Sequence, residues 1–329
     1  MNLKKIGLTA LAGSLVATSA IAGEMTISGG AKLSYTSHGG NDTTTTDVAS
    51  GFAMDQEMAA SGSGELDNGM VVTVTHSLAA SGSTSDSSYL TLDMGDMGTL
   101  SYSDDDQHGG LASLDDMMPK AYEEADDGFS STTTKNFAEM PSGQGFGYTT
   151  TVNNLGISVG YSDGIGAEAA RTDGGQDTSA STNSSSSVAL TYTLEDLGLT
   201  VFGGMGNEGQ ADGKELDHST VGAIYAYGPV TVGYQTNSEE DSDSTATNTD
   251  LDTTIYSVAF NVNENLSLSY GEHNTEQEGA TTDQEINSVQ ASYSMGGMTI
   301  NLKDSEMTGT GNTANKNNET TEVLVTFAF

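Results

Sequence analysis

Residues 145–162 read GFGYTTTVNNLGISVGYS. Apolar residues alternate with small or polar ones on both sides of the Asn153-Asn154 pair, most clearly at Leu155, Ile157, Val159 and Tyr161. Side chains of a β-strand point alternately to opposite faces, so each half predicts a strand with one apolar face. Asn-Asn tolerates positive φ and is typical of a tight hairpin turn. The stretch therefore predicts two antiparallel strands joined by a short turn.

The same alternation recurs along the rest of the chain, whereas a 3.6-residue helical period is not sustained beyond the first 22 residues. It predicts sixteen strands, at 24–36, 51–63, 69–78, 87–94, 98–104, 145–152, 155–163, 187–194, 197–206, 218–227, 230–237, 253–262, 265–273, 285–295, 298–306 and 320–329. The three prolines, Pro119, Pro141 and Pro229, all fall between these segments. No proline therefore interrupts a predicted strand ladder.

The connections between these strands also alternate, between short turns and long polar loops. The long loops are 37–50, 79–86, 105–144, 164–186, 207–217, 238–252, 274–284 and 307–319. Short turns at one end and long loops at the other predict an up-and-down meander. An even number of strands of about ten residues is typical of outer-membrane barrels. We therefore predict an all-β fold, a 16-stranded antiparallel transmembrane β-barrel with short periplasmic turns and long extracellular loops.

The two faces of the predicted strands differ in polarity, and this difference indicates which face points out of the barrel. One face carries large apolar side chains, and the other is mostly Ser, Thr, Gly, Ala and Asp. A soluble sixteen-stranded barrel with an apolar lumen would leave an interior that side chains cannot fill. We therefore expect the apolar face to contact lipid and the polar face to line a water-filled lumen. Tyrosines on the apolar face are candidates for aromatic girdles, namely Tyr35, Tyr161, Tyr225, Tyr227, Tyr234, Tyr270 and Tyr293.

The first 22 residues have the plan of a secretory signal peptide. Lys4 and Lys5 precede an apolar run over 6–16, and Ala20-Ile21-Ala22 forms an A-x-A cleavage site. The run is too short for a membrane-spanning helix, which needs roughly 20 apolar residues. We expect residues 1–22 to be removed after export and residues 23–329 to form the barrel domain.

The composition is strongly acidic and excludes several classes of protein. There are 46 Asp and Glu against 9 Lys and Arg, for a net charge of −37, and no Cys. Loss of residues 1–22 removes two lysines, which gives −39 (−37 − 2) over 307 residues (329 − 22). A disulfide framework is impossible without Cys, and the charge excludes nucleic acid as a partner. We expect the lipid-facing positions to hold almost none of this charge, which would gather in the long loops and the lumen.

Three stretches of the chain resemble the general-diffusion porin family of Gram-negative outer membranes. Residues 64–70 (GELDNGM) resemble the turn after the family's second strand, and 90–100 (LTLDMGDMGTL) resemble its fourth strand, turn and fifth strand. The chain ends with Val325, Phe327 and Phe329 at alternate positions, similar to the terminal signal read by the outer-membrane assembly machinery. The resemblance implies a homotrimer of sixteen-stranded barrels whose third long loop folds inward to form the constriction.

In this sequence the third long loop is 105–144, and it is unusually acidic. The candidate constriction residues are Asp105, Asp106, Asp115, Asp116, Glu123, Glu124, Asp126 and Asp127. Such porins usually set a row of basic residues across from the loop, but this chain has a single arginine, Arg171, placed in a loop. Lys32 and Lys303 are the candidate basic residues of the pore wall. A solvated extracellular loop is the competing interpretation of 105–144.

These features predict a passive channel rather than an enzyme. A pore lined with carboxylates concentrates cations and excludes anions, so small hydrophilic solutes and cations are the expected permeants. No cofactor is expected, although the acidic loops could bind Ca²⁺ through oxygen ligands. The five histidines show no metal-pair spacing, and a P-loop motif is absent from the sequence. The alternatives are a secreted, acidic, β-rich adhesin or surface-layer protein, and a substrate-specific channel of the same fold.

Overall fold

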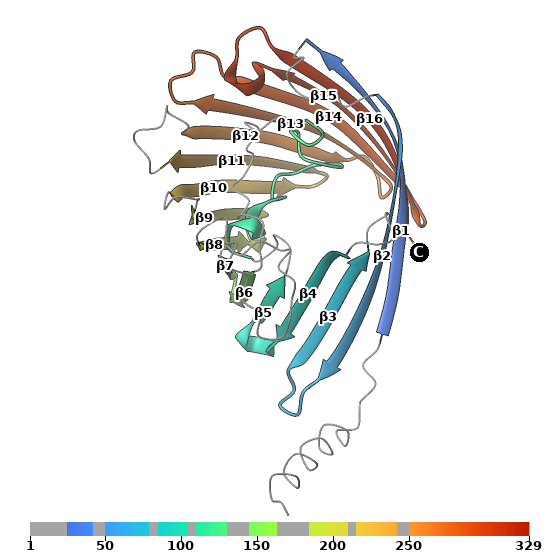
Figure 1. The fold of residues 1–329 in the computed structure, drawn as a ribbon, viewed down its shortest axis with the longest axis vertical. Coiled ribbons are helices and arrows are strands. Elements are labelled where there is room, and N and C mark those ends of the chain that lie inside the picture. The colour runs from blue at the N-terminus through green and yellow to red at the C-terminus, as the bar shows by residue number, and fades with distance from the viewer. Residues whose placement is uncertain are drawn as a thin grey trace, which may run out of the picture.

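Sixteen antiparallel strands form one closed barrel (Figure 1), in a computed structural model that describes residues 25–41, 50–78, 85–103, 109–129, 145–162, 184–209, 215–241 and 250–328. Each strand pairs with its neighbours in the sequence, and β1 pairs with β16 to close the ring. The strands are β1 Met25–Gly40, β2 Gly51–Glu65, β3 Val71–Leu78, β4 Ser85–Asp93, β5 Thr99–Ser103, β6 Gly145–Val152, β7 Leu155–Ser162, β8 Ser185–Leu194, β9 Leu199–Gly209, β10 Glu215–Tyr227, β11 Val230–Asp241, β12 Leu251–Asn261, β13 Leu266–Gln277, β14 Gln284–Met295, β15 Met298–Thr308 and β16 Asn317–Ala328. Among the described residues, no helix has the length and apolar character needed to cross a membrane. Residues 1–22, expected to be a signal peptide, lie outside the described part of the chain.

The predicted fold class is confirmed, and the strand boundaries differ mainly at the end with the long loops. β11 continues to Asp241 and β13 to Gln277, each several residues beyond the predicted end. Apolar alternation stops before these polar extensions, but the backbone ladder between neighbouring strands continues, as at Asp252↔Glu276. Strand length here depends on inter-strand hydrogen bonds, which the apolar pattern does not report.

Short turns close the other end of the barrel with the backbone that their sequences predict. Asn153 has φ 55°, Gly228 and Gly296 both have φ 60°, and Gly198 has φ 64°. A positive φ is tolerated by Gly and Asn because their side chains impose little steric penalty there. Short 3₁₀ turns at Gly95–Met97 (η1) and Glu195–Leu197 (η3) complete two of these connections.

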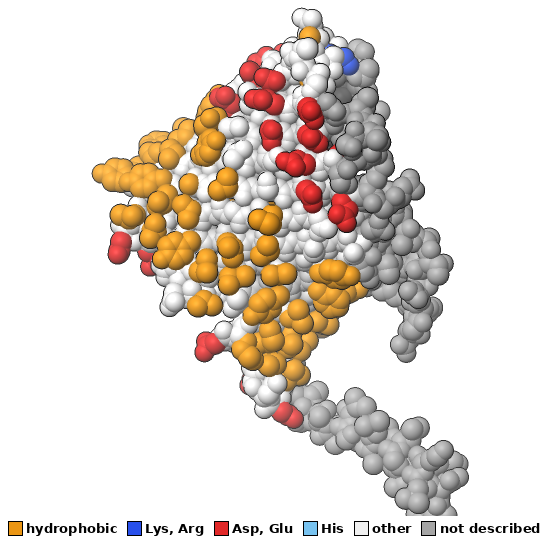
Figure 2. Space-filling model, turned by 90° about the vertical axis from the view of Figure 1, so that its left-hand side faces the viewer, with side chains coloured by type: hydrophobic (Ala, Val, Ile, Leu, Met, Phe, Trp, Pro, Cys, Tyr) orange, Lys and Arg blue, Asp and Glu red, His pale blue; other side chains and the backbone are white. Residues whose placement is uncertain are grey.

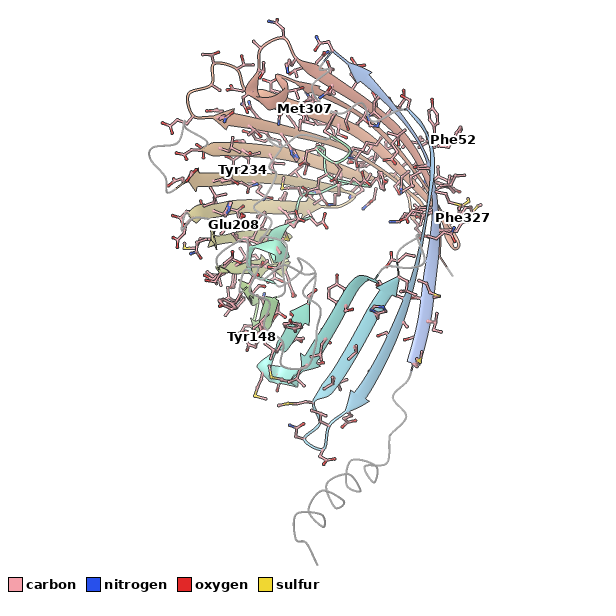
Figure 3. The ribbon with its side chains drawn as sticks, viewed as in Figure 1. Phe52, Tyr148, Glu208, Tyr234, Met307 and Phe327 are labelled. Atoms are coloured by element: carbon pink, nitrogen blue, oxygen red, sulfur yellow. The ribbon has the colours of Figure 1, made fainter. Side chains whose placement is uncertain are left out.

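Burial across the wall is the reverse of that in a soluble protein. On β15, Leu302 is 47% exposed, whereas its neighbours Asn301 and Lys303 are 6% and 2% exposed. Phe52 and Phe327 point away from the barrel (Figure 3). A broad band of hydrophobic side chains crosses the face of the outer wall seen in Figure 2. The seven predicted girdle tyrosines are all exposed. An apolar outer belt is what a lipid-facing wall requires.

The outer wall also carries acidic side chains, which corrects the expectation that lipid-facing positions hold almost none. Strand register places Asp252 and Glu276 opposite each other, on the same outward face as Tyr256. Register likewise places Glu285, Asp304, Glu306 and Glu319 on the outward face of β14, β15 and β16. These acids lie at the long-loop end, and acidic side chains border the hydrophobic band (Figure 2). Part of the net charge is therefore outside the barrel rather than in the lumen.

Candidate functional site

Residues 109–129 of the third long loop lie against the inward face of the barrel and are called here the inner segment. The segment begins beside β7, β8 and β9 and ends beside β16, where Gly128 approaches Thr320. Figure 1 shows it as the green trace inside the ring of strands. Residues 104–108 and 130–144, including the candidates Asp105 and Asp106, lie outside the described part of the chain.

The inner segment begins at a close contact between its backbone and the wall. The N–H of Gly110 donates to Ser158 Oγ at 2.8 Å, and the N–H of Leu111 donates to Ser187 Oγ at 2.9 Å. Gly110 has φ 63°, and a Cβ there would lie 2.0 Å from Ser187 Oγ and 2.8 Å from Gly160 N. A side chain at position 110 would therefore be both strained and obstructed. Just after this contact the segment forms a short 3₁₀ turn, η2 (Gly110–Leu114).

A small hydrophobic cluster holds the first half of the segment inside the barrel. Leu111, Leu114 and Met118 are buried against apolar side chains of the wall, namely Ala189, Phe202 and Ile255. Apolar area removed from water stabilises the contact by about 25 cal/mol per Å². Phe202 and Ile255 are apolar exceptions among inward positions that are otherwise mostly polar.

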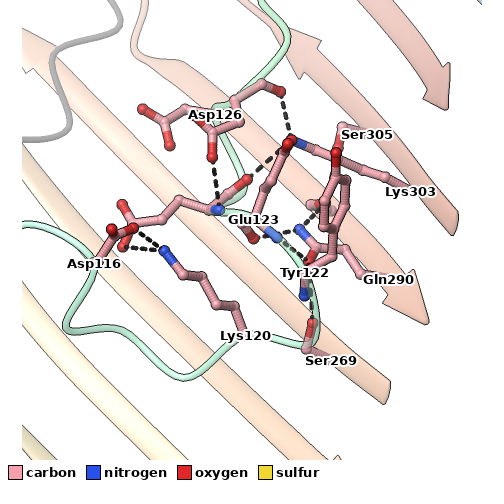
Figure 4. A network of polar contacts seen from close by, with 12 residues as sticks. Asp116, Lys120, Tyr122, Glu123, Asp126, Ser269, Gln290, Lys303 and Ser305 are labelled. Atoms are coloured by element: carbon pink, nitrogen blue, oxygen red, sulfur yellow. Dashed lines mark hydrogen bonds and ion pairs between the residues drawn. The ribbon is translucent and has the colours of Figure 1, made fainter. Parts of the chain in front are cut away.

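Hydrogen bonds from β13 and β14 hold the second half (Figure 4). The N–H of Ala121 donates to Ser269 Oγ at 2.9 Å. Gln290 Oε1 accepts the N–H groups of Tyr122 and Glu123, each at 3.1 Å, and Gln290 Nε2 donates to the Glu123 carbonyl at 2.7 Å. One glutamine side chain thus satisfies three backbone groups of the loop.

Lys303 was predicted to line the pore wall, and its position corrects that prediction. It is on the inward face of β15, but the inner segment covers it and leaves it 2% exposed. Its ammonium donates to the carbonyls of Glu124 at 3.0 Å and Asp127 at 2.5 Å, and pairs with Glu123 Oε2 at 3.3 Å. Lys303 therefore tethers the segment, because a buried ammonium needs several acceptors to replace water.

The acidic candidates of the segment divide into two groups. The side chain of Asp116 is 80% exposed and Asp127 is exposed, while Asp115 and Glu123 are half-buried. Glu124 and Asp126 are nearly covered, with 8% and 10% exposed side chains. Burial, together with the charges of Glu124 and Asp127, raises the pKa of the Asp126 carboxyl well above its usual range. The first group reaches solvent on the lumen side, although Glu123 also pairs with Lys303, and the second group is covered by the wall.

Lys120 is a basic residue of the segment that the sequence interpretation missed. It pairs with Asp116 and lies 3.8 Å from Glu124. Burial alone would lower the pKa of Lys120, but its hydrogen bond to Asp116 and the charges of Glu124 and Asp116 raise it. Its i, i+4 spacing from Asp116 was the available signal.

On the other side of the barrel, Lys32 is exposed on the inward face of β1. Its position opposite Asp55 in the β1–β2 register provides a carboxylate beside it. Arg171 lies outside the described residues. In the described part of the lumen, each of these lysines therefore has a carboxylate beside it, and the lysines do not form a basic row.

The C-terminal residues sit at the seam of the barrel. Val325 pairs with Leu33, and Phe327 pairs with Ala31 of β1 and Met298 of β15. Phe327 is exposed on the outer wall (Figure 3). Phe329 lies outside the described residues.

Known proteins resemble this chain in sequence pattern and in fold. A family model described as "Gram-negative porin" matches residues 7–300. Comparison with curated protein sequences gives no match. Among solved structures, a refined porin has a TM-score of 0.65 at 16% identity, covering 93% of this chain and 100% of its own. An anion-selective porin from Comamonas acidovorans has a TM-score of 0.65 at 11% identity, covering 93% of this chain and 99% of its own. A mutant of Rh. blastica porin has a TM-score of 0.62 at 14% identity, covering 93% of this chain and 100% of its own.

Proposed function

The chain belongs to the Gram-negative porin family, and we propose that its outer-membrane barrel forms a water-filled, cation-preferring channel for passive diffusion of small hydrophilic solutes and ions. Channel function follows from the family and from the closed sixteen-stranded wall with its apolar outer face. Barrels of this size leave an aqueous interior. A secreted adhesin would expose this apolar outer belt to water, which is unfavourable, so the adhesin alternative is disfavoured.

The observation that supports cation preference is the charge facing the lumen along the inner segment. Asp116, Glu123 and Asp127 reach solvent there, while Lys303 is buried and Lys120 is paired with Asp116. Fixed carboxylates in a narrow passage raise the local concentration of cations and exclude anions. One structural neighbour is described as anion-selective, so the shared fold does not determine the sign of the selectivity.

A reversal-potential measurement in a planar bilayer tests the preference directly. With a KCl gradient across the membrane, we expect a potential of the sign given by K⁺ permeating faster than Cl⁻. The potential should be largest in dilute salt, because the Debye length grows from about 10 Å at 0.1 M to about 30 Å at 0.01 M. A potential of the opposite sign would reject cation preference while leaving channel activity intact.

We also propose an assembly and an export route that the family resemblance supports. The functional unit is a homotrimer in outer-membrane lipid, residues 1–22 are removed on export, and Val325, Phe327 and Phe329 form the signal for the assembly machinery. Single-channel recordings should show conductance steps in groups of three, and N-terminal sequencing of the mature protein should begin at Gly23. Isolated single steps from a stable monomer would contradict the trimer.

A further inference from the structure

Two covered acids of the inner segment and one histidine of the wall form a cluster that the proposed channel function does not use. Glu124, Asp126 and His273 each offer a ligand atom, and these three atoms all lie within 4.8 Å of one another. His273 is on the inward face of β13 and is 3% exposed. An imidazole nitrogen and two carboxylate oxygens are thus brought together by segments about 150 residues apart in sequence.

The distance between the imidazole and Asp126 fits two ligands of one ion. His273 Nδ1 lies 3.4 Å from Asp126 Oδ1. Two ligand atoms bound tetrahedrally to one ion at 2.0–2.1 Å are separated by roughly 3.3 Å.

The local backbone is fixed before any ion binds. Ala125, between the two acids, is buried against Ile286 and Met307 of the wall. The N–H of Glu124 donates to Asp127 Oδ2 at 2.9 Å, which closes a tight turn around Asp126. A site whose ligands are held in place loses little conformational entropy on binding.

The charge around the cluster is negative in excess. Glu123, Glu124, Asp126 and Asp127 follow one another within five residues, and Glu322 of β16 interacts with Glu123 and Asp127. Lys303 directs its ammonium to Glu123 and to two backbone carbonyls, and Lys120 lies 3.8 Å from Glu124. Two lysines face five carboxylates, so a divalent cation would reduce the repulsion.

From this geometry we propose that Glu124, Asp126 and His273 bind a first-row divalent ion of the zinc type, which joins the inner segment to β13. A mixed nitrogen and oxygen ligand set suits Zn²⁺ or Co²⁺, whereas Ca²⁺ prefers six to eight oxygen ligands. The site accordingly differs from the Ca²⁺ sites that acidic loops alone would suggest. The three protein ligands leave a fourth position for water.

Cobalt absorption tests the site without any measurement of channel activity. The full protein, purified from membranes in detergent without a histidine tag and stripped with EDTA, is titrated with Co²⁺. We expect one equivalent to bind with the ligand-field absorption of a four-coordinate ion. One equivalent of Zn²⁺ should displace it, and a large excess of Ca²⁺ should not. Absence of a stoichiometric complex, or ready displacement by Ca²⁺, would overturn the proposal.

Substitutions assign the ligands. His273→Gln, Glu124→Gln and Asp126→Asn should each weaken Co²⁺ binding by about 100-fold or more, because loss of even an outer-shell partner of a ligand costs about 10–100-fold in metal affinity. The matched control is His218→Gln. His218 is also a buried, inward-facing histidine, but its carboxylate neighbours Glu208 and Glu239 lie near opposite ring nitrogens, at 3.4 and 3.6 Å.

Unchanged binding in His273→Gln, or equal loss in the control, would refute the assignment. Heat-modifiable mobility verifies that each variant is a folded barrel, and the two loop variants decide the question if His273→Gln does not fold. Because absorption does not depend on ion flow, failure of this proposal leaves the channel proposal standing, and the reverse also holds.

Discussion

Replacement of Lys303 by methionine should release the second half of the inner segment from the wall. Methionine retains most of the length and apolar packing of the lysine stem but removes the ammonium. That ammonium makes two hydrogen bonds to backbone carbonyls, at 3.0 and 2.5 Å, and one ion pair at 3.3 Å. The barrel itself should still assemble, because β15 keeps its full ladder with β14 and β16.

The size of the effect follows from these contacts. Hydrogen bonds to charged groups contribute about 1.5–3 kcal/mol each, and breaking a buried pair costs about 3–5 kcal/mol. Glu123 is 32% exposed, so water can solvate its carboxylate once the lysine is gone. The expected cost is therefore at the lower end of the range for a broken buried pair. A loss of about 3 kcal/mol in docking free energy raises the population of the undocked segment roughly 100-fold, since about 1.4 kcal/mol corresponds to a factor of ten.

Hydrogen exchange measures that population directly. In Lys303→Met, exchange of the amides of Ala121, Tyr122 and Glu123 should accelerate by roughly 100-fold, because local opening controls their exposure. Lys32→Met is the matched control, because Lys32 is an exposed lumenal lysine and its loss should change exchange by no more than a few fold. Exchange rates that differ by less than about threefold between Lys303→Met and the parent would refute the tethering role of Lys303.

Two further perturbations test the placement of the segment and the origin of selectivity. Ala125 Cβ lies 3.1 Å from the position that a Cβ on Gly271 would take. The double variant Ala125→Cys, Gly271→Cys should therefore form a disulfide after a shift of about half an ångström, and the mass change on reduction detects it. The chain has no other Cys, so persistent free thiols under oxidising conditions would argue against the docked position. Asp116→Asn should lower the preference for K⁺ over Cl⁻ in dilute salt, because the exposed Asp116 carboxylate faces the lumen. Glu276→Gln, on the outer wall, should leave the preference unchanged. Equal effects of the two substitutions would contradict a lumenal origin of the selectivity.

The strand count, the turn positions and the inverted faces were all predictable from alternation, as the 145–162 hairpin illustrates. Side-chain periodicity is a local property of each strand. It was enough to predict the barrel because each strand pairs with its neighbours in sequence. The ends of the strands were not predictable in the same way. Polar extensions at Asp252 and Glu276 continue the ladder without an apolar signal, and so acids expected in loops lie on the outer wall.

The site was less predictable than the fold. The acidic content of the third loop was visible, but its division into exposed and covered acids depends on which wall residues meet it. Lys303 occupied an inward register and still is not a lumen-lining residue, because the loop covers it. His273 and Gln290 gave no sequence signal, since their contacts are with residues more than a hundred positions away.

The hydrogen bonds between the wall and the inner segment involve mainly the segment's backbone, while Leu111, Leu114 and Met118 supply its apolar contacts. Ser158, Ser187, Ser269 and Gln290 accept its N–H groups, and Lys303 donates to its carbonyls. Backbone groups are the same whatever side chains the loop carries, apart from the glycine at position 110. The lumenal side chains of this loop can therefore be exchanged, by evolution or in the laboratory, without redesigning the surface that holds it. The same barrel wall can therefore hold loops whose lumenal side chains give the channel different charges.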